Sequence, residues 1–194
     1  MIENVSIQDR DLFGRLSVYF DSIEQRLREG QGWLIFNADP KRSGRISRFI
    51  GDRLREYRPL LSSYVVPWRD FALNAYMLKV ELVPRAAPSA EPETDPRQRQ
   101  EYAIAGRVSQ DMYYQMRYCD LLVLHGVAPA YPHELGYLDQ IITDRHQNRR
   151  ASILISPRMP HELAAGFKAL DGDGGHDSWQ QFFGRLYDTC LIAL

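Results

Sequence analysis

Lysine is scarce in this sequence of 194 residues: it occurs only at Lys41, Lys79 and Lys168, and arginine supplies nearly all of the positive charge. Arginine favours bidentate contacts to phosphate or carboxylate groups, although a genome rich in G and C produces the same bias. The formal net charge of −1 argues against nucleic-acid binding by bulk charge alone, but it leaves room for a local basic patch.

Cysteine is also scarce, and the two thiols, Cys119 and Cys190, each stand beside an apolar run. They are typical of small buried side chains in a reducing compartment rather than of a disulfide framework. No apolar run approaches the roughly 18 residues that a membrane-spanning helix needs. Residues 1–10 contain no apolar segment of the kind found in signal peptides. We therefore expect a cytoplasmic protein without membrane contact.

Short, almost wholly apolar segments alternate along the chain with segments of helical spacing. The expected strands are residues 33–36, 63–66, 121–124, 152–156 and 190–194, and the expected helices are 11–28, 46–57, 69–82, 104–117, 133–145 and 179–187. This alternation predicts one α/β domain over residues 1–194, with a parallel sheet covered by helices on both faces. Prolines and charges of both signs within residues 84–103 predict a flexible insertion.

The polar segment after the first expected strand is similar to a phosphate-binding loop that has lost several residues. In the pattern G-x-x-x-x-G-K-[ST], backbone N–H groups wrap the phosphates, and the lysine neutralises their charge. Aligned on Gly44, Arg45 stands at the lysine position and Asp39 at the first glycine. Ile46 replaces the hydroxyl residue, with Ser47 one residue on. The candidate phosphate-binding residues are Lys41, Arg42, Ser43, Gly44, Arg45 and Ser47.

Three cations within five residues at a helix N-terminus favour an anion site. The alternative is an ordinary strand-to-helix connection, because many such loops contain glycine and arginine.

The strand at residues 121–124 lacks the acid that usually follows such a strand in nucleotide hydrolases. There a carboxylate holds magnesium through its water shell, and a neighbouring acid orients the attacking water. Here His125 and Gly126 occupy the two positions. A neutral imidazole is a poor ligand for magnesium, and glycine has no side chain. We expect lost hydrolysis, no metal site, and either no cofactor or ATP or ADP without tightly bound magnesium.

Several segments together resemble the AAA+ P-loop ATPase family of the helicase loader DnaC and the transposition helper IstB. They are Cys119–Leu124, Leu138–Arg150, Ser152–Pro157 and Met159–Leu163, preceded by a similar order of elements over residues 16–54. The resemblance implies an AAA+ core of three layers without a C-terminal helical lid. It places Ser156 at the sensor position and Arg185 at the arginine finger. Both Walker motifs of this family are degenerate here.

Three functions remain open. The first is a non-hydrolysing assembly or regulatory subunit in DNA replication or transposition, with a helicase, a transposase or another ATPase subunit as its partner. Its open or mixed oligomers would have DNA nearby, contacted by Arg145, Arg149 and Arg150. The second is a pure interaction subunit without nucleotide. The third is an active ATPase that takes its carboxylate from Asp39, Asp120 or Glu134.

Overall fold

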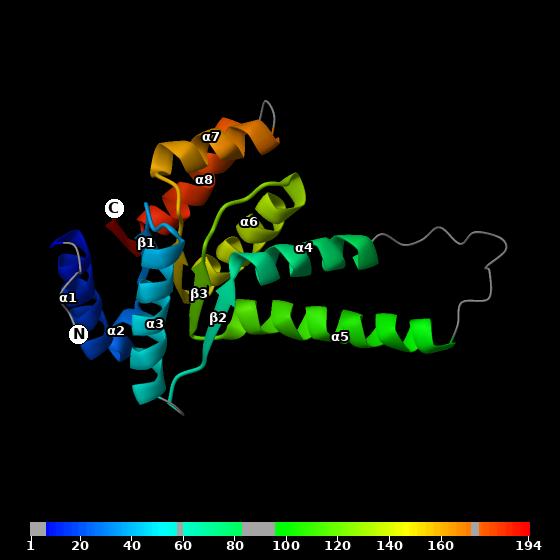
Figure 1. Ribbon diagram of the computed structural model, residues 1–194, viewed down its shortest axis with the longest axis horizontal. Helices are drawn as coiled ribbons and strands as arrows, with labels where there is room; N and C mark the ends of the chain where they lie inside the picture. Colours follow the sequence, from blue (N-terminus) through cyan, green and yellow to red (C-terminus); the bar gives the residue numbers. More distant parts are fainter. Residues whose placement is uncertain (1–6, 58–59, 83–95, 172–174) are drawn as a thin grey trace.

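The computed structural model in Figure 1 describes residues 7–57, 60–82, 96–171 and 175–194. One or two helices separate each strand from the next along the chain. The elements are α1 (Ile7–Asp21), α2 (Ile23–Arg28), β1 (Gly32–Ile35), α3 (Pro40–Glu56), β2 (Ser63–Pro67), α4 (Trp68–Leu82), α5 (Pro96–Tyr118), β3 (Leu121–His125), α6 (Pro132–Gln147), β4 (Ala151–Ile155), α7 (Pro160–Asp171), α8 (Gly175–Tyr187) and β5 (Cys190–Ala193). Of these described helices, none is both long and apolar enough to cross a membrane.

The five strands form one sheet in the order β2-β3-β4-β1-β5, and every neighbouring pair is parallel. The central strands β3, β4 and β1 are almost wholly buried, as their continuous apolar runs predict. β2 and β5 are the edge strands and are more exposed. The predicted α/β fold class with a parallel sheet is confirmed.

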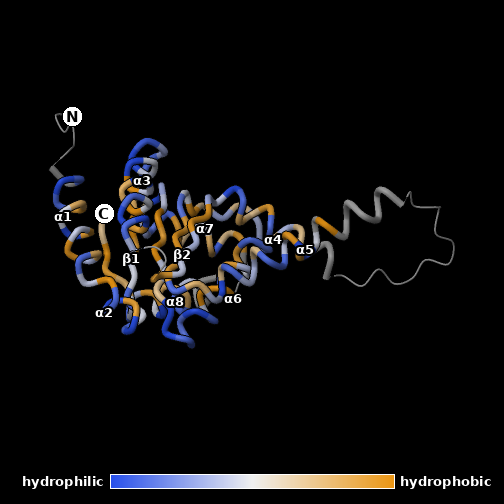
Figure 2. Tube along the Cα trace, turned by 90° about the horizontal axis from the view of Figure 1, so that it is seen from below, coloured by the Kyte–Doolittle hydropathy of each residue, from blue (hydrophilic) through white to orange (hydrophobic). Residues whose placement is uncertain are grey.

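Side chains on the two faces of the sheet enter two separate hydrophobic clusters. Trp33 and Ile35 of β1 point toward α1, α2 and α3, whereas Leu34 points toward the layer of α4 to α8. Figure 1 shows these two helical layers and the antiparallel pair α4 and α5, which extends away from the sheet. Outer helices such as α1 and α3 alternate between hydrophilic and hydrophobic residues along the trace in Figure 2. The fold is therefore a sandwich of three layers.

Two segments that were expected to lie outside helices contain helical residues. Residues 37–45 were expected to form a loop, but α3 begins at Pro40. The helix begins there because the carboxylate of Asp39 caps it. This carboxylate accepts from the backbone N–H groups of Lys41 and Arg42 at 2.8 Å each. Of the predicted insertion at residues 84–103, residues 96–103 belong to α5, whose first residue, Pro96, suits a first helical turn. The remainder of that insertion, residues 84–95, lies outside the described residues.

A buried guanidinium joins the starts of two central strands. Arg145, near the end of α6, is 1% exposed. It donates to the Ser152 hydroxyl at 2.9 Å and to backbone carbonyls of Met116 at 2.8 Å and Cys119 at 2.9 Å. The carbonyl of Ala151 is a further acceptor. Several segments thus depend on one side chain, since buried polar groups need partners.

Replacing Arg145 should destabilise the fold strongly. In Arg145→Met the carbonyls lose their donors, so we expect a loss of about 3 kcal/mol or more in the free energy of unfolding. Arg145→Lys should recover only part of it, because an ammonium group cannot reproduce the planar fork of donors. Urea unfolding measures the free energy of unfolding of both variants, with Arg149→Met, at an exposed site, as the control. Equal stability of the two methionine variants would contradict this role.

Candidate functional site at the carboxyl edge of the sheet

The carboxyl ends of β1, β3 and β4 meet at one edge of the sheet, which is where ligands bind in parallel α/β folds. The loop after β1, His125 at the end of β3, and Ser156 after β4 all lie at this edge. The structure thus brings together the predicted phosphate loop, the position of the missing acid and the sensor position. The basic residues Arg145, Arg149 and Arg150 lie at the opposite edge, where β4 begins.

The connection from β1 to α3 has only four residues, Phe36–Asp39. Asn37 in this connection adopts a left-handed backbone with φ of 52°. Gly44 and Arg45 lie inside α3 rather than in a loop. A Cβ atom added at Gly44 would meet nothing within 4 Å, so no close backbone approach requires glycine there. This connection does not have the length of a loop that wraps phosphates.

Arg42 points into the protein and is 8% exposed. Its Nε donates to Asp9 at 2.7 Å, and its Nη1 donates to the carbonyls of Phe36 at 3.1 Å and Asn37 at 3.0 Å. Its Nη2 donates to the carbonyl of Leu194 at 3.2 Å. The guanidinium therefore ties α1, the β1–α3 connection and the end of β5 together.

Arg45 donates to the same carboxylate, with Nη2 2.6 Å from the other oxygen of Asp9. Burial alone would raise the pKa of Asp9, but the hydrogen bonds from Arg45 and Arg42 outweigh it and hold that pKa below its ordinary value. Sequence reasoning missed Asp9, because one acid near a helix start carries no signal of partners more than thirty residues away.

The remaining candidates of this segment are dispersed around α3. Lys41 is exposed, and its side chain has no ion-pair partner among the described residues. Ser43 is 5% exposed and thus turned inward. The hydroxyl of Ser47 is buried without a hydrogen-bond partner in the described part of the chain. The six predicted phosphate-binding residues therefore do not converge on one point.

His125 is half-buried at the end of β3, beside Pro67 of β2 and Ile155 of β4. Burial lowers the pKa of its imidazole, and the Asp70 carboxylate acts in the opposite direction without overcoming it. The ring is thus uncharged at neutral pH. Within residues 7–57, 60–82, 96–171 and 175–194, no group of three or more His, Cys, Asp or Glu side chains could hold a metal ion. A neutral imidazole at this position is a poor ligand for magnesium, which prefers oxygen donors.

Ser156 and Arg185 both make contacts within the chain. The Ser156 hydroxyl donates to the carbonyl of Val127 at 2.8 Å and accepts from the backbone N–H of Arg158 at 3.1 Å. Arg185 of α8 pairs with Asp139 of α6. The serine therefore joins the segments after β3 and β4, and the arginine joins two helices of one layer.

Arg145 was predicted to contact DNA, and this part of the prediction is wrong, because a side chain that is 1% exposed cannot reach a phosphate. Arg149 is exposed, and Arg150 is held by the carbonyl of Tyr118 and, at 3.4 Å, by Asp120. These two arginines stay candidates for DNA contact.

A scan against known protein families finds no match to this sequence, and a search of curated proteins finds none either. Solved structures do match. The crystal structure of the DnaC helicase loader has a TM-score of 0.64 and 12% sequence identity, over 99% of this chain and 93% of that chain.

Two further structures match over about half of their own length. AMPPCP-bound DnaA from Aquifex aeolicus has a TM-score of 0.61 and 12% identity, over 98% of this chain and 48% of that chain. A DNA replication initiation factor has a TM-score of 0.58 and 12% identity, over 99% of this chain and 48% of that chain. Identities this low concern the fold alone. The chain has an α/β fold with a five-stranded parallel sheet, similar to the fold of the DnaC helicase loader.

Proposed function

We propose that this chain is a non-hydrolysing assembly or regulatory subunit of a DNA-replication machine, and that it works through protein contacts without bound nucleotide. The observation that carries the proposal is the start of α3 at Pro40, four residues before Gly44. The first free N–H groups of that helix would have to bind the phosphates. They bind the Asp39 carboxylate instead.

A phosphate at this position would meet negative charge rather than donors. Hydrogen bonds from the backbone N–H groups of Arg42 and Lys41 lower the pKa of Asp39, so its carboxylate is ionised at neutral pH. Arg42 cannot compensate, since its guanidinium is engaged with Asp9 and three carbonyls. The capped N-terminus of α3 favours a subunit that works without bound nucleotide.

The three carboxylates that could rescue ATP hydrolysis are engaged elsewhere. Asp39 caps α3, and Asp120 binds the hydroxyl and backbone N–H of Ser62 at the opposite edge of the sheet. Glu134 is 5% exposed and accepts from the backbone N–H of Ala130 at 2.7 Å. An active ATPase with non-standard residues is therefore the least supported of the three functions.

The replication setting rests on the fold shared with a helicase loader and with DnaA. We infer that the partner is a replicative helicase or an initiator, with a transposase as the alternative. The test is light scattering of the purified chain mixed, in separate experiments, with the replicative helicase and with the initiator of the same organism. We expect a complex that forms equally well with ATP, with ADP or without nucleotide. A complex that requires ATP, or binding to neither helicase nor initiator, would contradict the proposal.

Nucleotide should not bind to the isolated protein. We expect no saturable heat when ATP and magnesium are titrated by calorimetry, because no set of donors converges on the phosphates. The informative variant is Lys41→Ala, since this exposed cation is the candidate most available to a phosphate, with Lys79→Ala as its matched control. Magnesium-dependent binding that only Lys41→Ala weakens would overturn the conclusion.

The Asp9 carboxylate should make stability depend on pH. Its pKa in the folded protein lies below its ordinary value, so its stabilisation is complete above the ordinary value and is lost as pH falls through the folded one. Asp9→Asn should cost about 3 kcal/mol at neutral pH, and the difference from the wild type should shrink below about pH 4.

Urea unfolding between pH 3 and pH 7 measures this difference, with Asp11→Asn as the matched control on the same helix. The Asp11 side chain is 71% exposed and lies 3.9 Å from Arg15, so its replacement should change little. A pH-independent cost for Asp9→Asn would show that the two arginines do not stabilise the charged carboxylate.

A further inference from the structure

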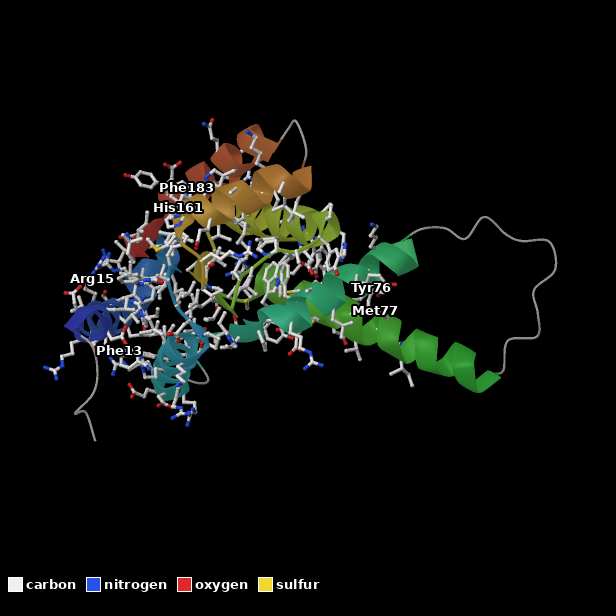
Figure 3. All side chains as sticks on the ribbon, turned by 45° about the horizontal axis from the view of Figure 1, so that its top comes forward. Phe13, Arg15, Tyr76, Met77, His161 and Phe183 are labelled. Carbon is white, nitrogen blue, oxygen red and sulfur yellow. The ribbon has the colours of Figure 1, made fainter. Side chains whose placement is uncertain are left out.

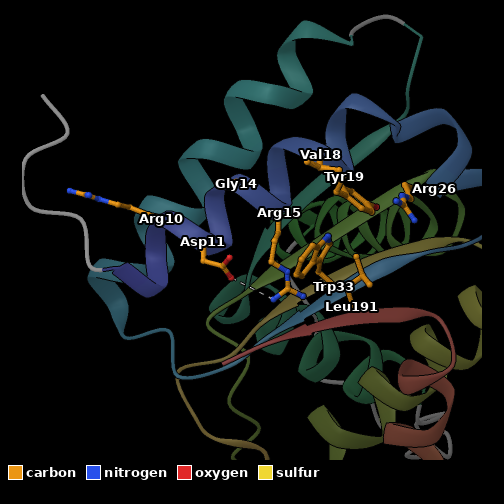
Figure 4. Close-up of a pocket in the computed structure, with 9 residues that line it drawn as sticks. All are labelled: Arg10, Asp11, Gly14, Arg15, Val18, Tyr19, Arg26, Trp33 and Leu191. Atoms are coloured by element: carbon orange, nitrogen blue, oxygen red, sulfur yellow. Dashed lines mark ion pairs between the residues drawn. The ribbon is translucent and has the colours of Figure 1, made fainter.

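A groove of about 540 Å³ runs between α1 and the edge strand β5, away from the site described above. Its floor is formed by Trp33 of β1 and Leu191 of β5, which are paired in the sheet. Gly14 and Val18 of α1 form one wall (Figure 4). The groove exists because α1 covers β1 but leaves part of the same face of β5 open.

An unused hydrogen-bond donor lies at this floor. Trp33 is 0% exposed, and its indole Nε1 has no hydrogen-bond partner among the described residues. The neighbouring Tyr19 packs edge-on against the Trp33 ring, with 6.2 Å between the ring centroids. The Tyr19 hydroxyl donates to the carbonyl of Gln31 and so does not accept from the indole. A buried N–H group without an acceptor is unusual in folded proteins and marks a place where an acceptor would be stabilised.

Arg15 lies over the face of the ring that carries this donor. Its guanidinium carbon lies 5.0 Å from the centroid of the Trp33 ring. Figure 3 shows Arg15 and Phe13 on α1. Phe13 packs against Phe49 of α3 and not against the Trp33 ring. The attachments of Arg15 are weak: a bond of 3.2 Å to the carbonyl of Ile192 and a contact of 3.9 Å to Asp11. With a side chain 44% exposed, Arg15 can move away without disturbing the core.

The backbone of β5 faces the groove with groups that another strand could use. The carbonyls of Thr189 and Ala193 accept at 2.9 Å each from backbone N–H groups in and just after β1. The carbonyl of Ile192, between them, therefore points to the free edge. Arg15 occupies that carbonyl. A charged side chain over an edge strand hinders uncontrolled pairing with other chains, and it leaves a place for a partner that can displace it.

The charge around the groove selects an acidic partner. Three arginines, Arg10, Arg15 and Arg26, line it against the single carboxylate of Asp11. Arg10 is exposed, and within the described part of the chain it makes no ion pair. Val18, which is 62% exposed, and Leu191 add an apolar strip. Cations beside apolar side chains fit a segment in which acidic and apolar residues alternate.

We propose that this groove binds an extended acidic segment of a partner protein along the free edge of β5. A carboxylate of the segment pairs with Arg15 and draws it off the Trp33 ring, after which the indole N–H donates to the segment and the Ile192 carbonyl accepts from its backbone. Nucleic acid fits less well, since the buried rings of Trp33 and Tyr19 offer no face for stacking bases. The proposal does not depend on the function in replication.

The test uses the whole protein and two capped peptides, acetyl-Val-Glu-Val-Glu-Val-Glu-amide and its glutamine counterpart. The indole N–H resonance of Trp33 is followed by NMR, assigned by elimination with Trp68→Phe and Trp179→Phe. We expect the glutamate peptide to shift this resonance and to bind at least tenfold more tightly than the glutamine peptide, with weaker binding at higher salt.

Arg10→Glu should weaken binding of the glutamate peptide at least tenfold, whereas Arg48→Glu, at an exposed site on α3, should not. Three outcomes would overturn the proposal: an unchanged Trp33 resonance at millimolar peptide, equal binding of the two peptides, or equal effects of the two arginine variants. A Trp33 resonance that responds to oligothymidylate at lower concentration than to the peptide would assign the groove to nucleic acid instead.

Discussion

The ion pair between Arg42 and Asp9 is the interaction on which the candidate site depends. A buried guanidinium must be paired and hydrogen-bonded, and Arg42 meets this requirement with partners from α1, the β1–α3 connection and the end of β5. These three segments consequently hold one another in place. The connection cannot open into a loop around phosphates unless the charge of Arg42 loses its partners, so the closed shape follows from the cost of burying charge.

The sheet could be predicted from the sequence because a strand buried on both faces must be apolar at every position, which residues 121–124 and 153–155 are. The start of α3 could not be predicted while the segment was aligned with a phosphate-binding loop. The signal was nevertheless present: Asp39 followed by Pro40 is a common helix start, with a capping acid and a proline in the first turn. Two patterns shared the same residues, and the local capping interaction prevailed.

Individual site residues were harder to predict, because their partners are distant in the sequence. Arg145 lies in a segment with Arg149 and Arg150 and looks like part of a basic surface, yet its acceptors include carbonyls at residues 116 and 119. Ser156 was identified as a strand-end hydroxyl, but its acceptor, the carbonyl of Val127, follows a different strand. Composition and spacing describe single elements well. The pairing of polar groups depends on which elements become neighbours, and that is settled only by the fold.

The cap of α3 also has a consequence for control of the protein in the cell. A soluble phosphate ligand occupies a site in proportion to its concentration, whereas the Asp39 carboxylate is covalently attached beside the helix that it caps and is always present. If the chain binds no nucleotide, as proposed, the balance of ATP and ADP in the cell does not control this end of the sheet. The activity of such a subunit would then follow its own abundance and that of its partners rather than a cycle of nucleotide hydrolysis.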